Sequence, residues 1–466
     1  MQQFGLAGLG VMGKSLSLNL AGKGVQLSLY NRYEADVEEN VAASFIASHT
    51  ELAGAKGFED IASFVQSLSV PRCIFLMVPA GEAVDEMIHL LLPHLSAGDV
   101  LIDGGNSFYK DTERRCMQLL QSSILFVGTG VSGGEEGALK GPSIMPGGSA
   151  EGYAAVKIFL ENIAAKDKTG KPCCSFIGKG GAGHFVKMIH NGIEYAEMQL
   201  LAEVYDILRW TAGYEPDKIT ETFNWQLDTN VNSYLLEITA RVLKKKEGNS
   251  FLIDNVLDKA GNKGTGGWAS IAACELGVAI PSLTAGLFAR YQSEFLAERQ
   301  AAAALYTIQR TTAAVDTAAL FDAYSLARIV NHHQGFHLID AASQAYGWNI
   351  DMPALARIWT NGCIIRSELM SSLQDILKDT SRILLHPSIV EIVKTQLPQL
   401  NHILALAAIN NAATPCLAAS AHYLHYYIQE QSSANIIQAQ RDYFGAHTYQ
   451  RKDDPSGKKH HTDWKI

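Results

Sequence analysis

The feature that most limits the fold is a glycine-rich segment near the amino terminus, Gly8-Leu9-Gly10-Val11-Met12-Gly13-Lys14-Ser15. It follows the apolar run Phe4 to Ala7 and opens a helical pattern, which indicates the strand-to-helix turn of a nucleotide-binding α/β domain. The segment matches both GxGxxG, found where dinucleotides bind, and GxxxxGK[ST], the P-loop of nucleotidases. A turn that binds nothing is a third interpretation. The segment alone does not decide among them.

Residues 1–178 alternate short apolar runs with amphipathic segments. The runs are Phe4 to Ala7, Val25 to Tyr30, Cys73 to Val78, Val100 to Asp103, Ile124 to Gly128 and Ser175 to Gly178. This alternation predicts a parallel sheet with helices on both faces, as in a doubly wound Rossmann-type domain.

Residues 179–440 carry long stretches rich in Ala and Leu and predict a large all-α domain. The stretches are His184 to Gly213, Ala269 to Gln309, Ala318 to Ala345, Met352 to Leu377 and Leu400 to Ser432. Residues 441–466 are polar and cannot form a core, so this C-terminal tail is either disordered or an arm that packs on something else.

Composition excludes several classes of protein. The 466 residues carry 38 Lys and Arg against 47 Asp and Glu, a net charge of -9, which disfavours nucleic acid as a partner. The seven Cys are scattered without a CxxC pair, so we interpret them as packing residues. The amino terminus lacks the features of a signal peptide, and no apolar run is long enough to span a membrane. We expect a soluble, cytoplasmic protein.

The residues after the second apolar run favour NADP over NAD. A dinucleotide fold places the end of this strand at the adenosine ribose, where an acid suits a free 2′-hydroxyl and an Arg suits a 2′-phosphate. Here the run ends in Asn31-Arg32-Tyr33, and Arg32 offers a fork for the phosphate. Asp103 keeps the P-loop alternative open, because it would hold magnesium there and would be a turn residue in a dinucleotide fold.

Two segments with flexible backbone and short polar groups follow apolar runs, where ligands bind to open α/β sheets: Ala80-Gly81-Glu82 after the third run and Gly104-Gly105-Asn106-Ser107 after the fourth. The segments 131–138 and 141–148 (VSGGEEGA and GPSIMPGG) are unusually dense in Gly and small polar residues. Exposed backbone amides near Ser132 suit a substrate carboxylate or hydroxyl, although a pair of turns explains the same composition.

The segment from Gly183 to Tyr195 (GHFVKMIHNGIEY) places four polar residues on one helical stripe. Lys187, His190, Asn191 and Glu194 follow the spacing i, i+3, i+4 and i+7. A solvated charged face would explain such a stripe, but the helix also carries apolar residues and follows the nucleotide domain. In a desolvated cleft, Lys187 can lose its proton and act as a base.

Other basic residues are weaker candidates. The loop Lys263-Gly264-Thr265-Gly266-Gly267-Trp268 suits an oxyanion, and Arg290, Arg441 and His447 complete a basic set. The pairs His333/His337 and His422/His425 have spacing that suits a metal, but no carboxylates accompany them, so we expect no metal site.

The chain resembles the 6-phosphogluconate dehydrogenase family, decarboxylating enzymes of the pentose phosphate pathway within the β-hydroxyacid dehydrogenase superfamily. The resemblance covers essentially the full length and rests on eight motifs in order. They are GLGVMG at 8–13, NRY at 31–33, GGNS at 104–107, VSGGEEGA at 131–138, GPSIMPGG at 141–148, GHFVKMIHNGIEY at 183–195, KGTGGW at 263–268 and RDYFGAHTY at 441–449.

The resemblance implies oxidative decarboxylation of 6-phosphogluconate to ribulose 5-phosphate and CO2 with reduction of NADP. Lys187 would be the general base and Glu194 the acid that protonates C1. Substrate contacts would come from Asn106, Ser132, Gly133, Gly134, His190, Asn191, Tyr195, Lys263, Thr265, Arg290, Arg441 and His447. Cofactor contacts would come from Gly8, Leu9, Gly10, Val11, Met12, Gly13, Asn31, Arg32, Tyr33, Val78, Pro79, Ala80 and Asn106.

It also implies a homodimer with shared active sites, in which Arg441 and His447 come from the partner's tail. Two positions depart from the family: Tyr33 replaces a small hydroxyl residue, and Gly267 replaces a Lys. The alternatives are a non-decarboxylating β-hydroxyacid dehydrogenase, a P-loop nucleotidase and a catalytically silent NADP sensor.

Overall fold

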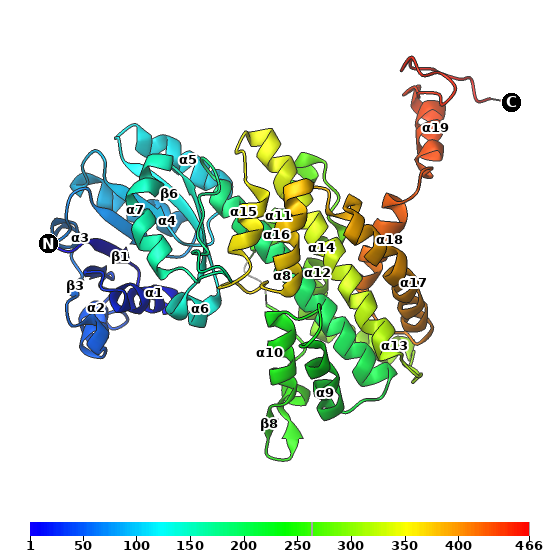
Figure 1. The fold of residues 1–466 in the computed structure, drawn as a ribbon, viewed down its shortest axis with the longest axis horizontal. Helices are drawn as coiled ribbons and strands as arrows, with labels where there is room; N and C mark the ends of the chain where they lie inside the picture. Colours follow the sequence, from blue (N-terminus) through cyan, green and yellow to red (C-terminus); the bar gives the residue numbers. More distant parts are fainter. Residues whose placement is uncertain (262–263, 466) are drawn as a thin grey trace. The chain divides into compact units, whose positions relative to one another are not determined.

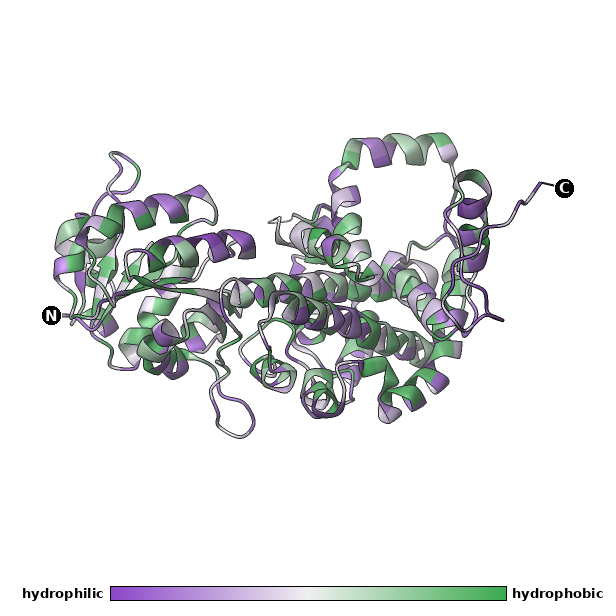
Figure 2. Ribbon diagram, turned by 90° about the horizontal axis from the view of Figure 1, so that it is seen from above, coloured by the Kyte–Doolittle hydropathy of each residue, from purple (hydrophilic) through white to green (hydrophobic). Residues whose placement is uncertain are grey.

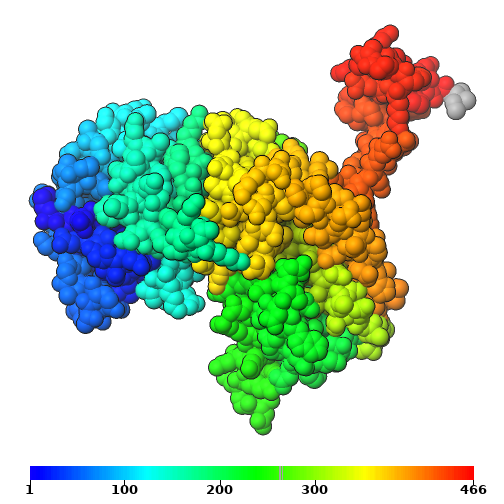
Figure 3. All heavy atoms as spheres, in the orientation of Figure 1, coloured from blue at the N-terminus to red at the C-terminus, as the bar shows by residue number. Residues whose placement is uncertain are grey.

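The computed structural model describes residues 1–261 and 264–465, apart from the side chain of Thr265 (Figure 1). The chain divides into two compact units, Met1–Ser420 and Ala421–Ile466. The first unit (blue to orange in Figure 3) contains both a sheet with its helices and a large set of further helices.

The sheet has seven strands in the order β3-β2-β1-β4-β5-β6-β7, and all neighbours are parallel except β6 and β7. The strands are β1 (Phe4–Ala7), β2 (Leu27–Tyr30), β3 (Lys56–Phe58), β4 (Cys73–Leu76), β5 (Val100–Asp103), β6 (Leu125–Ser132) and β7 (Ser143–Gly148). The strand order reverses between β1 and β4, which creates the crevice where open α/β sheets bind ligands.

Helices cover both faces of this sheet. They are α1 (Val11–Gly22), α2 (Val41–Ala47), α3 (Ile61–Gln66), α4 (Glu82–Leu91), α5 (Tyr109–Leu120), α6 (Gly134–Lys140) and α7 (Ala150–Ile163). Alternate residues of a strand enter different cores: Phe4 and Leu6 belong to one cluster, and Ala7 to the other. The expected Rossmann-type fold is confirmed.

Three details of the sheet differ from the sequence prediction. The segment Ser143–Gly148 is the antiparallel strand β7, although the sequence predicted no strand there, and β3 was not predicted either. Ser175 to Gly178 forms no strand and contributes only an isolated bridge from Gly178 to Gly147. The Pro and Gly residues of β7 lower its strand propensity, but an edge position tolerates them.

The helical part begins with the long helix α8 (Ala182–Asp206), which continues as a π-helical turn over Ile207–Thr211. The helices that follow are α9 (Pro216–Gln226), α10 (Tyr234–Leu243), α11 (Thr265–Leu276), α12 (Pro281–Glu294), α13 (Leu296–Tyr306), α14 (Thr317–Tyr346), α15 (Met352–Ile358), α16 (Glu368–Asp379), α17 (Pro387–Ile409) and α18 (Pro415–Tyr427). Their ribbons carry hydrophobic and hydrophilic colours side by side in Figure 2, as amphipathic helices do.

The prediction of an all-α region is correct except for one small antiparallel pair, β8 (Lys246–Glu247) with β9 (Ser250–Phe251). In the described ranges, no helix is long and apolar enough to cross a membrane.

Helix α8 contacts strands β6 and β7 at its start and helices α11, α12 and α14 further along. Gly130 of β6 makes the close approach to the sheet feasible, because a Cβ there would lie 2.5 Å from Cβ of Lys187. The helix therefore holds Lys187 against the end of the sheet while its later turns lie among the other helices.

The second unit contains α19 (Ala434–Gly445) and the tail that follows it. The buried carboxylate of Asp442 accepts hydrogen bonds from the backbone amides of Thr448 (2.9 Å) and Thr462 (3.0 Å), from His461 Nδ1 (2.9 Å) and from Trp464 Nε1 (2.8 Å). Burial alone would raise the pKa of Asp442, but these hydrogen bonds outweigh it and hold the pKa below its usual range. Asp442 thus ties the tail to α19.

Candidate active site

A cavity of about 630 Å³ lies at the crevice where the strand order reverses. It is lined by residues that follow β1, β4 and β5, by Val131 at the end of β6, and by Trp268 of α11. Among the predicted cofactor residues, it contains Gly10, Val11, Met12, Gly13, Val78, Pro79, Ala80 and Asn106. The structure therefore brings together three segments that are far apart in the sequence.

The glycine-rich turn leaves room for a pyrophosphate. Gly8 has a φ of +101°, and a Cβ there would lie 2.4 Å from the carbonyl oxygen of Met77. A Cβ at Gly10 would meet nothing within 4 Å, so the backbone is open on the side of the cavity. No side chain caps the start of α1, and its first amides can bind an anion. These features fit a dinucleotide.

Asp103 behaves as a turn residue. It is fully buried, and its carboxylate accepts hydrogen bonds from the amide of Gly105 (3.0 Å) and the hydroxyl of Ser107 (2.7 Å). Arg115 Nη1 lies 3.5 Å from the same carboxylate. Because these groups engage both oxygens, Asp103 shapes the loop that carries the exposed Asn106, as a dinucleotide fold requires, and is not poised to hold magnesium.

The end of β2 connects to the glycine-rich turn through Asn31, whose Oδ1 accepts a hydrogen bond from the amide of Leu9 (3.1 Å). The next residue, Arg32, is exposed and forms ion pairs with Glu34 (2.8 Å) and Glu38 (2.9 Å). The exposed Tyr33 donates a hydrogen bond to Glu39 (3.2 Å). No carboxylate follows β2 directly in the sequence, but the loop folds back and brings two of them to Arg32.

The polar stripe on α8 lies beside the cofactor cavity. Val131 lines the cavity, and the next residue, the buried Ser132, places its hydroxyl 3.1 Å from Nε2 of His190. Lys187 is only 7% exposed, so this side of α8 is not a solvated charged face. Oε2 of the half-buried Glu194 lies 3.7 Å from Nδ1 of His190. Asn191 is buried on the same stripe.

His190 is neutral at physiological pH. Its burial and the nearby charge of Lys187 hold its pKa well below the ordinary value, and the neighbouring side chain of Asn191 only partly offsets this. Its contact with Glu194 is therefore not an ion pair. Within the described part of the chain, Nδ1 of His190 has no hydrogen-bond partner. A buried ring nitrogen in this position is suited to a substrate hydroxyl.

A second polar group lies two helical turns further along α8, about 12 Å from Lys187 by the rise of an α-helix. Arg290 of α12 stacks 3.8 Å from the ring of Tyr195, and its Nη1 donates to the carbonyl of Gly261 (3.0 Å). The backbone of Gly266, near the start of α11, also packs on this ring, since a Cβ there would lie 3.1 Å from it.

The remaining predicted residues belong to three other segments of the chain. Lys263 lies outside the described residues, and Thr265 is the first residue of α11. Gly133 and Gly134, with φ values of +126° and +63°, form the turn between β6 and α6. Arg441 and His447 are exposed residues of the second unit. Their assignment to the active site remains a prediction.

Sequence reasoning missed several residues of the cofactor cavity. Trp268 was noted only as part of a motif, yet it lines the cavity and packs against Phe108 (5.0 Å between ring centroids). Met77 and Asp111 also line it. The signal for Trp268 was its place in the glycine-rich loop, but only the fold brings α11 to the edge of the sheet.

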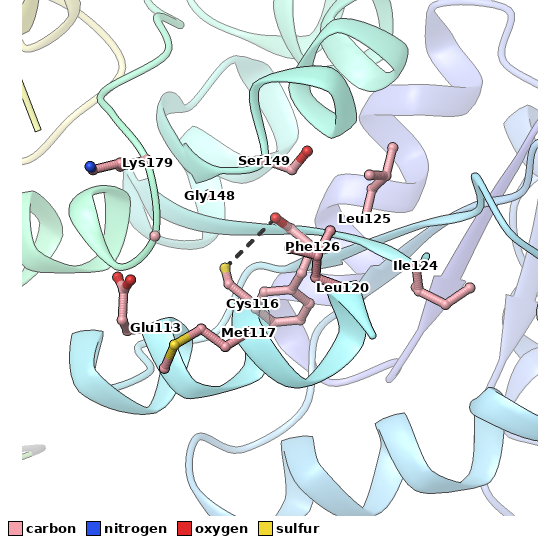
Figure 4. Close-up of a pocket in the computed structure, with 11 residues that line it drawn as sticks. Glu113, Cys116, Met117, Leu120, Ile124, Leu125, Phe126, Gly148, Ser149 and Lys179 are labelled. Atoms are coloured by element: carbon pink, nitrogen blue, oxygen red, sulfur yellow. Dashed lines mark hydrogen bonds between the residues drawn. The ribbon is translucent and has the colours of Figure 1, made fainter. Parts of the chain in front are cut away.

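A separate cavity of about 240 Å³ lies beside α5 and contains none of the predicted site residues (Figure 4). Cys116 lines it and points its thiol toward the carbonyl of Phe126. Burial raises the pKa of Cys116 to about 12, which keeps the thiol protonated and unreactive. No group of three or more potential metal ligands occurs in residues 1–261 and 264–465.

A Rossmann-type sheet with an open glycine-rich turn, beside a buried Lys–His–Glu stripe, defines a dinucleotide-dependent dehydrogenase. Residues 3–178 match the model of the NAD binding domain of 6-phosphogluconate dehydrogenase, and residues 183–464 match that of its C-terminal domain. The chain belongs to the 6-phosphogluconate dehydrogenase family, as the sequence motifs predicted.

Individual relatives come from the same family. The decarboxylating 6-phosphogluconate dehydrogenase of Aggregatibacter actinomycetemcomitans is 43% identical, over 99% of this chain and 96% of the relative. The NADP(+)-dependent, decarboxylating enzyme of Bacillus subtilis is also 43% identical, over 99% of both chains. A solved structure of Plasmodium falciparum 6-phosphogluconate dehydrogenase superposes with a TM-score of 0.93 at 36% identity, over 99% of this chain and 100% of that chain.

Proposed function

We propose that this chain catalyses the oxidative decarboxylation of 6-phosphogluconate to ribulose 5-phosphate and CO2 with NADP as oxidant. The observation that carries the proposal is the stripe formed by the buried Lys187 and His190 and the half-buried Glu194 beside the cofactor cavity. The names of the relatives and the bound NADP+ and 6-phosphogluconate described for the Plasmodium falciparum enzyme support the same reaction.

Lys187 acts first as the general base. NADP, when bound, supplies the hydride acceptor. Once it has lost its own proton, the buried amine of Lys187 takes the proton of the C3 hydroxyl as the hydride leaves C3, which gives a 3-keto acid. The neutral His190 does not compete for this proton, because burial disfavours its charged form.

The same lysine then promotes loss of CO2. The carboxylate of the 3-keto acid is β to the ketone, so the C1–C2 bond breaks without a metal when the ketone oxygen is polarised. Protonated Lys187 supplies that polarisation and stabilises the enediolate. Glu194, only partly exposed next to His190, donates the proton to C1 of the enediol.

The remaining predicted residues bind the substrate. Asn106, Ser132, Gly133, Gly134, His190 and Asn191 hold the sugar acid around Lys187. Tyr195 of α8 and Arg290 of α12, which stack together, hold the phosphate end with Lys263 and Thr265. Because the two groups lie at different points along α8, one can bind the reacting carbons and the other the terminal phosphate.

We further propose a cytoplasmic homodimer with shared active sites. Residues 1–178 form the NADP-binding domain, residues 179–440 the substrate and dimerisation domain, and residues 441–466 a tail that brings Arg441 and His447 to the partner's site. The support is the exposed apolar surface of α19, where Ile436, Ile437 and Phe444 are each more than half exposed.

The experiment is an assay of the purified protein with NADP and either 6-phosphogluconate or gluconate. Rapid reduction of NADP with the phosphorylated acid and at least about a hundredfold slower reduction with gluconate would support the proposal. Equal rates would contradict the assigned phosphate site. Light scattering on the same preparation tests the homodimer, and a monomer at assay concentration would contradict it.

A further inference from the structure

The loop after β2 contains one cation among four carboxylates. Residues 31–40 (NRYEADVEEN) carry Arg32 together with Glu34, Asp36, Glu38 and Glu39. Nη2 of Arg32 lies 2.8 Å from Oε2 of Glu34, and its Nε lies 2.9 Å from Oε2 of Glu38. The group expected to bind the 2′-phosphate of NADP is thus already engaged by two anions of its own loop.

The backbone of the loop builds this arrangement. Glu34 and Glu38 form an isolated antiparallel bridge, with the amide of Glu34 donating to the carbonyl of Glu38 (3.0 Å) and the reverse bond at 2.8 Å. The side-chain amide of Asn31 lies 3.4 Å from Oε2 of Glu38. Both carboxylates are therefore held beside the guanidinium by the fold of the loop.

We propose that Glu34 and Glu38 are specificity-determining residues. They weaken the binding of NADP and so make the affinity of this chain for NADP more similar to its affinity for NAD. The inference rests on the proposed function, because it concerns the same cofactor site. When NADP binds, the 2′-phosphate must displace these carboxylates from Arg32 and lie close to their charge. When NAD binds, Arg32 keeps its partners, and a carboxylate is available to accept a hydrogen bond from the free 2′-hydroxyl.

The expected effect is moderate. Exposed ion pairs are weak individually, so removal of each carboxylate should tighten NADP binding by about two- to fivefold. Removal of both should tighten it by about tenfold, because the repulsion between phosphate and carboxylate disappears as well. Salt should reduce the difference between variant and wild type.

The test measures equilibrium dissociation constants of NADP and NAD, by calorimetry, for the full chain and for the variant Glu34→Gln/Glu38→Gln. The expected result is an NADP Kd about tenfold lower with an NAD Kd that stays the same or rises. An unchanged ratio of the two constants would overturn the inference. Failure of wild type to bind either dinucleotide would instead refute the proposed function.

Two further variants separate the ion pairs from general loop charge. Glu39→Gln removes a carboxylate that contacts Tyr33 and the amide of Asp36 rather than Arg32. It should leave the ratio of constants nearly unchanged. In an Arg32→Ala background, the double Glu variant should change the NADP Kd by less than about twofold, as a double-mutant cycle requires. A full tenfold gain in that background would contradict a mechanism that acts through Arg32.

Discussion

Lys187 occupies an unusual place for a lysine, since it is 7% exposed and lies close enough to His190 and Cys363 for its charge to shift the pKa of both. Burial of a lysine costs free energy, and residues buried at such a cost cluster at functional sites. Two side chains of α8, Lys187 and Glu194, carry the proposed acid–base steps, and each can be substituted separately.

Lys187→Met should lower kcat by at least about a thousandfold, because the variant keeps the volume of the side chain but has no base. The NADP Kd should stay within about twofold of wild type, since Lys187 lies outside the glycine-rich turn. Lys140→Met is the matched control, because Lys140 is exposed and pairs with Glu136 on α6. Near-normal turnover of Lys187→Met would rule out the base assignment.

Glu194→Gln should slow the late protonation more than it weakens substrate binding. We expect kcat to fall by about a hundredfold while the KM for 6-phosphogluconate changes by less than about threefold. Rapid-quench analysis of a single turnover should still show reduced cofactor at an early time. An effect confined to KM would contradict the role of Glu194 as an acid.

At the scale of elements, a buried carboxylate connects α8 to α18. Glu203 accepts hydrogen bonds from the backbone amides of Cys416 (2.8 Å) and Leu417 (2.9 Å), which begin α18. Burial raises the pKa of Glu203 to about 7, although these amides favour its charged form. The folded protein therefore binds this proton more tightly than the unfolded chain does.

The free energy of unfolding should therefore decrease as the pH rises from about 4.3, the ordinary pKa of a glutamate. The decrease should continue until the pH passes the folded-state pKa of Glu203, which is about 7. Glu203→Gln has no such proton to lose. Between pH 5 and pH 8, the Tm of wild type should fall by at least about 2 °C relative to the variant. Differential scanning calorimetry across this range checks the sign, and parallel curves for the two proteins would refute it.

The tail and α19 form another connection between elements, in which Asp442 is the common acceptor. Asp442→Asn keeps the shape but replaces the Oδ2 acceptor of Thr462 and Trp464 with a donor. We expect faster amide exchange over residues 446–464 and a KM for 6-phosphogluconate raised by about tenfold, with NADP affinity unchanged. Unchanged exchange would show that Asp442 does not order the tail.

At the scale of the whole molecule, shared active sites predict complementation between inactive variants. Lys187→Met and Arg441→Ala should each be inactive alone. In a dissociated and reassembled equal mixture, half of the dimers are mixed and one of their two sites is complete, so activity should recover to about a quarter of wild type. Absence of recovery in verified mixed dimers would place Arg441 in the site of its own subunit.

The sequence predicted those parts of the molecule that depend on local pattern. β1 and β5 have the predicted bounds, and the 3.6-residue period placed Lys187, His190 and Glu194 on one stripe. The sequence did not predict contacts between distant segments, such as the position of Trp268 at the cofactor cavity. It also did not predict side-chain partners within a loop, because the pairing of Arg32 with Glu38 depends on how the backbone folds back.

The most direct test of the account follows reduced cofactor and released CO2 together, in an assay of the purified protein with 6-phosphogluconate, NADP and a metal chelator. Equal yields of the two products are expected, because NADP takes the hydride and Lys187 serves as base and then as acid for oxidation and decarboxylation in the same site. Reduced cofactor without CO2 would contradict it and indicate a dehydrogenase that does not decarboxylate.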